Sequence, residues 1–389
     1  MQERYAELVI AVQLRLIEGD SLTINTNART MSFARLVARK ATEVTKLPVT
    51  IVETSMGKVL QTYPIDPVEK GVMRPQVRTS VLAHIVDLDE FPYDEDEDWN
   101  EPHHEVRTLA HYGHLSDPVF LDRRISIPWA NIPYPETAWA ASMLGRLVSR
   151  EEMWSLFGIL MRLTSDWSPA YWAEQANVLS YREKLLNASS GRMISIKGSN
   201  TELIGEQSPL TGWISGVFRL PSGREYIPLL PVQSVHTAFK TGSVNGKIRS
   251  GSPFTLFGTP VTDAAFIIEN GVVVSYDARE GKEALKKYFD VDAGTNAASG
   301  ISLADSNTLE CRYITRLVHP HYKKECRSIL HLGGVLVDAI KAGTGEDDLF
   351  GLGQSIAHLE IPLAHDITVE MQKPDGSMKT IIAEGSFTV

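Results

Sequence analysis

The chain has 389 residues, of which 43% are hydrophobic and 22% charged, and its formal net charge at pH 7 is -10. This length predicts two domains, and the negative charge argues against a nucleic-acid partner because no basic field is available to neutralise phosphates. No apolar run reaches the roughly 20 residues that a membrane-spanning helix needs, and no signal-peptide pattern opens the chain. We therefore expect a cytoplasmic protein that binds neither nucleic acid nor membrane.

The first half of the chain alternates helical and strand-like segments. Apolar residues recur at helical spacing over 3–17 and over 32–45, and strand-like runs occupy 21–25 and 48–52. This order predicts a parallel sheet with right-handed crossovers, which is the arrangement of an α/β domain. No G-x-G-x-x-G motif follows either strand, so a dinucleotide cofactor is not expected.

An acidic run lies between residues 87 and 101. Asp87 opens it, and five consecutive acidic residues occupy 94–98. Like charges at this density repel one another, which predicts a solvated loop. The alternative is a docking patch for a basic segment of a partner, and the sequence leaves the role of this loop open.

The character of the sequence changes after residue 187. Residues 151–187 are predicted to be helical and are rich in aromatic side chains that suit core packing. Short strands and turns follow. Asn270 and Gly271 give the strongest hairpin signal, because both tolerate the positive φ angles of a type I′ turn. A second hairpin is predicted at 373–377.

Two further helices, at about 281–289 and 321–339, interrupt this β pattern. The sequence thus predicts an α/β N-terminal domain with a parallel sheet over residues 1–187. It predicts a β-rich α+β C-terminal domain over residues 188–389.

The most informative motif is Ser-Ile-Ala-His-Leu-Glu-Ile-Pro-Leu at 355–363. His358 and Glu360 stand two residues apart on a predicted strand, so their side chains point to the same face. An imidazole beside a carboxylate is half of a divalent-metal site. The G-x-S-x-G, H-E-x-x-H, C-x-x-C and P-loop motifs are absent from the sequence.

Several motifs together resemble the M29 family of metallo-aminopeptidases (aminopeptidase T and S type) and, more distantly, 2,5-dihydroxypyridine dioxygenase. They lie at 7–10 and 18–22, at 168–172 and 182–187 within the predicted helix 151–187, at 197–203 and at 358–363. The resemblance implies the fold of that family and a homodimer. It also implies a cleft in which two Glu, two His and an Asp hold two metal ions.

The sequence departs from the family pattern at most of the positions that match these ligands. Gln233 and Ser234 match the first Glu motif, and Gly300 matches the second Glu. Two cations about 3.5–4 Å apart need several anionic ligands to offset their repulsion. The resemblance therefore implies a degenerate cleft that holds no metal pair.

The histidine motifs are better preserved. His331 lies near the family's first His but out of register, in the predicted helix, whereas His358 and Glu360 stand on a His-x-Asp motif with Glu in place of Asp. These three side chains leave open a site for a single metal ion.

We interpret the chain as a non-catalytic peptide-binding protein without cofactor or catalytic residues. Its former cleft would clamp an extended peptide by strand addition, with these hydrogen-bond partners: Gln233, His236, His331, His358 and Glu360. Metal-free peptidase folds occur as accessory proteins in ribosomal-peptide natural-product (RiPP) biosynthesis, so the expected partners are a precursor peptide and a tailoring enzyme. The alternative is a mononuclear non-haem iron oxygenase or a metal-dependent hydrolase, with Fe or Zn held by His331, His358 and Glu360.

Overall fold

The computed structural model describes most of the chain. The described residues are 1–55, 58–68, 74–87, 126–164, 168–188, 193–308, 311, 327–335, 339–341, 351–355, 357–373 and 375–388. They fall into two compact units: the first takes the described parts of 1–93, 117–178 and 216–232, and the second takes the described parts of 179–215 and 233–389. The predicted domain boundary after residue 187 stays a prediction.

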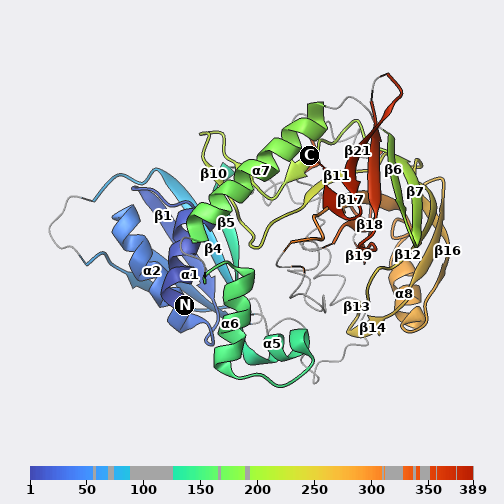
Figure 1. Ribbon diagram of the computed structural model, residues 1–389. Coiled ribbons are helices and arrows are strands. Elements are labelled where there is room, and N and C mark those ends of the chain that lie inside the picture. Colours follow the sequence, from blue (N-terminus) through green and yellow to red (C-terminus); the bar gives the residue numbers. More distant parts are fainter. Residues whose placement is uncertain are drawn as a thin grey trace. The chain divides into compact units, whose positions relative to one another are not determined.

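The first unit contains a five-stranded sheet with helices packed against it (Figure 1). Its strands, in the order β3-β2-β1-β4-β5, are β3 (Lys58–Ile65), β2 (Val49–Ser55), β1 (Asp20–Thr26), β4 (Thr79–Asp87) and β5 (Trp129–Tyr134). Strand β1 is parallel to β2 and β4, and β4 is parallel to β5, whereas β3 is antiparallel to β2. The predicted α/β architecture is confirmed, with one antiparallel strand at the edge.

The first helices of this unit lie where the spacing of apolar residues predicts them, over 3–17 and 32–45. The helices are α1 (Gln2–Leu8), which continues as the π-helical turn η1 (Val9–Gln13), α2 (Met31–Thr45), α5 (Thr137–Leu144), α6 (Arg150–Leu160) and the first half of α7 (Ser168–Ala188). The residues of α7 from Leu179 onward belong to the second unit. Helix α2 buries Phe33, Val37 and Ala41, which recur every four residues and form one apolar face. It ends at Lys46, which adopts a left-handed conformation.

The single helix predicted over 151–187 is wrong in its middle. Helix α6 ends at Leu160, and Arg162 has a φ of 57°, which no α-helix accommodates. The carbonyl of Met161 accepts hydrogen bonds from Ser168 Oγ (3.1 Å) and Trp172 Nε1 (3.0 Å) at the start of α7. These bonds satisfy the carbonyl that the break exposes.

A buried ion pair holds the start of β1. Arg224 donates to both carboxylate oxygens of Asp20, at 2.7 and 2.9 Å, and the backbone N–H of Ile17 donates to the same carboxylate at 2.9 Å. The Asp20 side chain is fully buried. Arg224 lies in the turn between β9 (Phe218–Arg219) and β10 (Glu225–Tyr226), so this pair ties a distant hairpin to the sheet.

Asp87 does not behave as part of a solvated acidic loop. Its side chain is fully buried at the end of β4, where it pairs with Arg29 (3.2 Å) and accepts a hydrogen bond from Asn27 (3.3 Å). A specific cation and an amide outweigh the like-charge repulsion at this position. The rest of the predicted loop, 88–101, lies outside the described residues.

The second unit is built mainly from antiparallel strands. An eight-stranded sheet has the order β16 (Val272–Asp277), β15 (Ala265–Glu269), β12 (Asn245–Arg249), β7 (Thr201–Glu206), β6 (Met193–Gly198), β20 (Thr368–Gln372), β21 (Met378–Ala383) and β22 (Ser386–Phe387). A five-stranded sheet has the order β19 (His358–Pro362), β18 (Ile329–Gly333), β17 (Ala298–Leu303), β11 (Val235–Ala238) and β8 (Ile214–Ser215). This β-rich architecture confirms the predicted fold class.

Among its described residues the unit also contains the hairpin β13 (Phe254–Leu256) with β14 (Thr259–Val261), and helix α8 (Lys282–Phe289), which confirms the prediction at 281–289. Asn270 and Gly271 have φ angles of 49° and 76° between β15 and β16, as the predicted type I′ turn requires. The hairpin predicted at 373–377 joins β20 to β21.

The helix predicted over 321–339 is contradicted in its described part. Residues 329–333 form strand β18, and all five are buried. Because β18 lies inside its sheet and both of its faces are covered, its five residues show no alternation of buried and exposed positions. Periodicity cannot distinguish such a strand from a buried helix. Residues 321–326 and 336–338 lie outside the described part of the chain.

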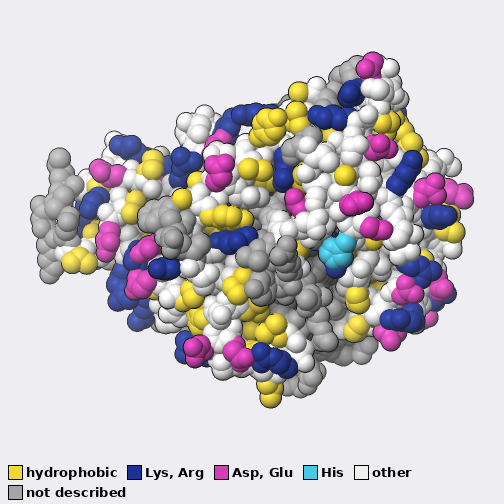
Figure 2. Space-filling model, viewed as in Figure 1, with side chains coloured by type: hydrophobic (Ala, Val, Ile, Leu, Met, Phe, Trp, Pro, Cys, Tyr) yellow, Lys and Arg dark blue, Asp and Glu magenta, His cyan; other side chains and the backbone are white. Residues whose placement is uncertain are grey.

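Acidic and basic side chains are interspersed over the face drawn in Figure 2. Several form ion pairs in the second unit, including Arg249 with Asp263 and Lys282 with Asp277, each at 2.8 Å. Within the described residues, no helix has both the length and the apolarity that crossing a bilayer requires.

Candidate metal centre

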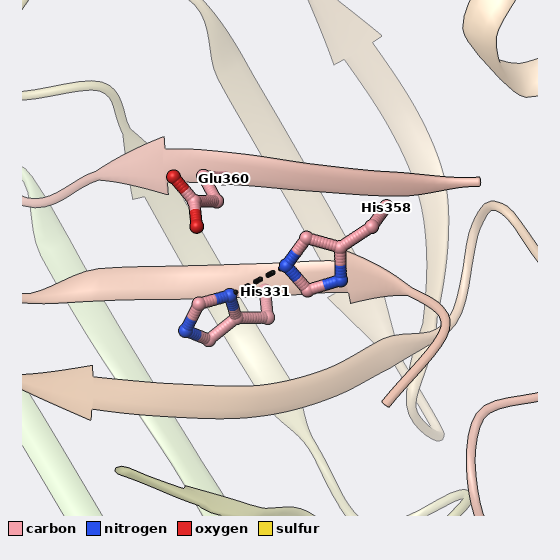
Figure 3. A group of neighbouring side chains, drawn as sticks. All are labelled: His331, His358 and Glu360. Atoms are coloured by element: carbon pink, nitrogen blue, oxygen red, sulfur yellow. Dashed lines mark hydrogen bonds between the residues drawn. The ribbon is translucent and has the colours of Figure 1, made fainter. Parts of the chain in front are cut away.

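Strand register places three candidate ligands on one face of the five-stranded sheet. His331 on β18 stands opposite Glu360 on β19, and Gly333 stands opposite His358. Residues two apart on a strand share a face, so all three side chains project from the same side. Figure 3 shows His358 and Glu360 on one strand and His331 on its neighbour.

The two imidazoles are in direct contact. Nδ1 of His331 lies 2.9 Å from Nε2 of His358, and the ring centroids are 4.9 Å apart (Figure 3). The side chains are almost completely buried, with 1% of His331 and 5% of His358 exposed. Glu360 is half-buried, and one donor atom from each of the three residues lies within 4.8 Å of the other two.

The hydrogen-bond partners assign the tautomers of the pair. Nδ1 of His358 lies 2.8 Å from the carbonyl oxygen of Gly334, which can only accept, so this nitrogen carries a hydrogen. In a neutral imidazole Nε2 of His358 is then an acceptor, and Nδ1 of His331 donates to it. Nε2 of His331 in turn accepts from the hydroxyl of Ser302, 2.6 Å away. With both rings neutral, each group donates to the next in the same order: Ser302 to His331, His331 to His358, and His358 to the Gly334 carbonyl.

The backbone around His358 is set by glycines and a buried tyrosine. Gly333 has a φ of 88°, and a Cβ there would lie 2.3 Å from the carbonyl oxygen of Ala357 and 2.6 Å from the hydroxyl of Tyr288. That hydroxyl donates to the Leu332 carbonyl at 3.0 Å. Burial raises the pKa of Tyr288 well above its usual value, so the phenol keeps its hydrogen. Only glycine at position 333 allows the carbonyl of the next residue, Gly334, to reach Nδ1 of His358.

The donor set suits one divalent cation. Two imidazole nitrogens and a carboxylate oxygen are the protein ligands of several catalytic zinc sites and of non-haem iron(II) sites. His358 donates its Nδ1 hydrogen to the Gly334 carbonyl, and a histidine that binds a metal through one ring nitrogen usually donates the hydrogen of the other in this way. The residues present therefore fit a single zinc or iron ion.

The other two predicted site residues lie outside this cluster. His236 on β11 stands opposite Ser302 on β17, so it shares the face of His331 but lies two strands away. Gln233 precedes β11 and is buried, with 2% exposed. The group of donor atoms that could hold a metal among the described residues contains neither of them.

Sequence reasoning missed two contributors, the Ser302 hydroxyl and the Gly334 carbonyl. Each acts through the register of β17, β18 and β19, which no local motif encodes. The available signal was the spacing of two residues between Gly300 and Ser302, because on a strand it places Ser302 on the same face as a residue that matches a family ligand.

The comparisons with known proteins agree with this fold. Aminopeptidase 2 of Geobacillus stearothermophilus is 22% identical over 290 residues, which cover 72% of this chain and 69% of that protein. The solved structure of wild-type AmpT from Thermus thermophilus has a TM-score of 0.76 and 18% identity, and covers 100% of this chain and 99% of that one.

The solved structure of 2,5-dihydroxypyridine dioxygenase from Pseudomonas putida KT2440 is more distant, with a TM-score of 0.52 and 11% identity. The match covers 100% of this chain and 96% of that one. The profile of the family described as thermophilic metalloprotease (M29) matches residues 1–387. This match extends over nearly the whole sequence, and the chain therefore belongs to the M29 metalloprotease family.

Proposed function

We propose that this protein is a hydrolase of short peptides that works with one divalent metal ion, held by His331, His358 and Glu360. The observation that carries the proposal is the convergence of three donor atoms within 4.8 Å on one face of the sheet. Membership of a metalloprotease family and similarity to proteins named aminopeptidases support peptide hydrolysis as the reaction.

The chain's own residues prepare this site in distinct ways. The Gly334 carbonyl fixes His358 with its Nε2 lone pair directed at His331. Burial of both imidazoles keeps bulk water from competing for their nitrogens. Glu360 supplies negative charge at the more exposed side of the group. A divalent ion bound there would act as a Lewis acid toward a peptide carbonyl and lower the pKa of water.

The competing function is metal-free peptide binding, the interpretation drawn from the missing anionic ligands. It accounts for Gln233 and Gly300, where the resemblance implies carboxylates. It assigns His331, His358 and Glu360 to hydrogen bonds with a peptide, a role that does not require their donor atoms to converge within 4.8 Å. The family match and the donor geometry therefore favour a single-metal enzyme over a pseudoenzyme. The precursor peptide, the tailoring enzyme and the homodimer stay predictions.

Metal binding and hydrolysis can be measured on the same preparations. The purified chain is stripped with a chelator and titrated calorimetrically with Zn²⁺ and, without oxygen, Fe²⁺. Hydrolysis is then followed with a panel of unblocked tripeptides. His358→Ala removes a ligand, and His365→Ala is a matched control, because His365 belongs to the same unit but lies outside the cluster.

We expect about one metal ion per chain and metal-dependent hydrolysis in the parent and in His365→Ala, and neither in His358→Ala. Tripeptide binding without metal uptake or hydrolysis would establish the non-catalytic function instead. Oxygen consumption with an aromatic substrate in the iron-loaded protein would point to an oxygenase.

A further inference from the structure

We propose that Ser302 is a positioning residue of this site: its hydroxyl holds the Nε2 edge of His331, so that His331 offers Nδ1 to a metal ion. The proposal rests on the proposed function, because it concerns how one of the three ligands is presented. It assigns the two histidines different ligand atoms, Nδ1 for His331 and Nε2 for His358.

The geometry around Ser302 supports a specific contact. Ser302 lies on β17 with 1% of its surface exposed, and its Oγ is 2.6 Å from Nε2 of His331. Its register partners are Ile329 on β18 and His236 on β11, so it is diagonal to His331 on their shared face. Because Nε2 of His331 is occupied by this hydroxyl, Nδ1 is the nitrogen that faces His358 and Glu360.

The two histidines are held by chemically different partners. The Gly334 carbonyl can only accept, which fixes the hydrogen of His358 on Nδ1. A hydroxyl can donate or accept, so Ser302 is compatible with either tautomer of His331. His358 therefore keeps one tautomer, whereas His331 can exchange one for the other.

This difference matters because metal binding requires such an exchange. In the metal-free protein the Ser302 hydroxyl donates to Nε2, and the hydrogen on Nδ1 of His331 bonds to His358. When Nδ1 is the ligand atom, the hydrogen of the neutral ring is on Nε2, and Ser302 Oγ accepts it. The hydroxyl reverses its direction, and His331 stays neutral in both states.

Threonine and valine at position 302 test the hydroxyl alone. The two side chains have nearly the same shape and both suit a strand, but only Thr keeps the hydroxyl. Each variant is titrated with Zn²⁺ and with Co²⁺, whose absorption spectrum reports the ligand set. Because removal of the group that hydrogen-bonds to a metal ligand typically lowers metal affinity by about 10–100-fold, we expect Ser302→Val to bind both ions that much more weakly than Ser302→Thr.

Histidine ¹⁵N NMR of the zinc-loaded protein gives a readout that a packing defect alone does not move. We expect His331 in the parent and in Ser302→Thr to show a metal-bound Nδ1 and a protonated Nε2. In Ser302→Val this signature should be lost or mixed. Ser195→Ala removes a buried serine from β6 in the other sheet and is the control for serine loss.

The outcomes separate the two proposals. Equal affinities and the same His331 signature in Ser302→Thr and Ser302→Val would overturn the role of Ser302 while leaving the metal site in place. A parent protein that binds neither Zn²⁺ nor Co²⁺ at the histidines would overturn the proposed function, and the assignment of ligand atoms with it. Circular dichroism in the presence of chelator establishes that each variant is folded.

Discussion

A buried ion pair in the first unit and a buried histidine pair in the second show two uses of polar side chains inside a β-sheet. Asp20 and Arg224 have opposite charges, two direct hydrogen bonds and a further backbone donor. His331 and His358 are chemically alike, and with both rings neutral they gain no mutual charge attraction. The first pair holds together two segments that are distant in the sequence. The second pair places two ring nitrogens where they suit a metal ion.

The partners around each pair reinforce this difference. The Asp20 carboxylate is saturated by a guanidinium and an N–H, which leaves little capacity for a ligand. In the second unit the bond between the imidazoles joins one nitrogen from each ring, and both nitrogens are suitable metal ligands. A buried polar pair whose mutual bond joins two potential ligand atoms is therefore a better indication of function than burial alone.

Removal of one partner from the ion pair should cause the largest loss of stability. Arg224→Ala leaves the Asp20 carboxylate buried without its cation, and we expect the free energy of unfolding to fall by about 3–5 kcal/mol. Urea denaturation measures this change. Arg219→Ala, in the same β9–β10 hairpin, removes an exposed pair with Glu225 and should cost about 1 kcal/mol or less. Equal losses for the two variants would contradict the assigned role of Asp20.

Gly333→Ala should have the next largest effect and should affect both stability and metal affinity. The new Cβ conflicts with the Ala357 carbonyl and the Tyr288 hydroxyl at a positive φ. A strained residue of this kind costs roughly 1–3 kcal/mol. The adjustment moves the Gly334 carbonyl, so zinc affinity should fall as well. Gly376→Ala is the control: it has a similar φ of 84° and open space around the Cβ position.

Replacement of both histidines should cost the metal-free fold less than breaking the ion pair. In the double variant His331→Leu, His358→Leu, both partners of the bond between the rings become apolar together, which is close to neutral, but the Ser302 hydroxyl and the Gly334 carbonyl each lose a partner, at about 1 kcal/mol each. We expect its unfolding free energy in chelator to fall by about 2 kcal/mol. The rise in Tm that zinc gives the parent should be absent. A loss as large as that of Arg224→Ala would mean that the pair serves the fold.

The smallest effect is expected at the surface, in the capping box of α6. Ser149 and Glu152 exchange side-chain-to-backbone hydrogen bonds, and Arg146 donates to the Glu152 carboxylate at 2.8 Å. The hydrogen bond from Arg146 is the main cause that lowers the pKa of Glu152 from 4.5 to about 2.

Because the folded pKa is depressed, the contribution of Glu152 to stability is present above about pH 4.5 and is lost as the pH falls toward 2. Glu152→Gln should therefore lower stability slightly at neutral pH and flatten its decline between these values, as thermal melts at a series of pH values can measure. Glu151→Gln, one position away and outside the capping box, should leave the pH profile unchanged.

The fold was largely predictable because its elements are locally encoded. The alternation of helix and strand up to β2, the Asn270–Gly271 turn and helix α8 all depend on spacing or on one turn. Strand β18 was not predictable in this way, because a fully buried strand loses the period of two.

The site was predictable only in part, because only two of its three candidate ligands are close together in the sequence. His358 and Glu360 share a strand, so period-two alternation places them together. His331, Ser302 and the Gly334 carbonyl join them through pairing between strands that are separated by about 30 residues of chain. Correct placement of His331 required the register of β18, and the helix predicted there concealed it.

The separation of Ser302, His331 and His358 along the chain has a consequence for the order of events during folding. A site built from one helical motif can capture a metal ion while the rest of the chain is still unfolded. Here the ligand atoms converge only after β17, β18 and β19 have paired, so an early ion meets at most the isolated His358–Glu360 pair. Zinc should therefore slow unfolding without accelerating refolding, and its uptake by a refolding sample should follow the formation of the sheet.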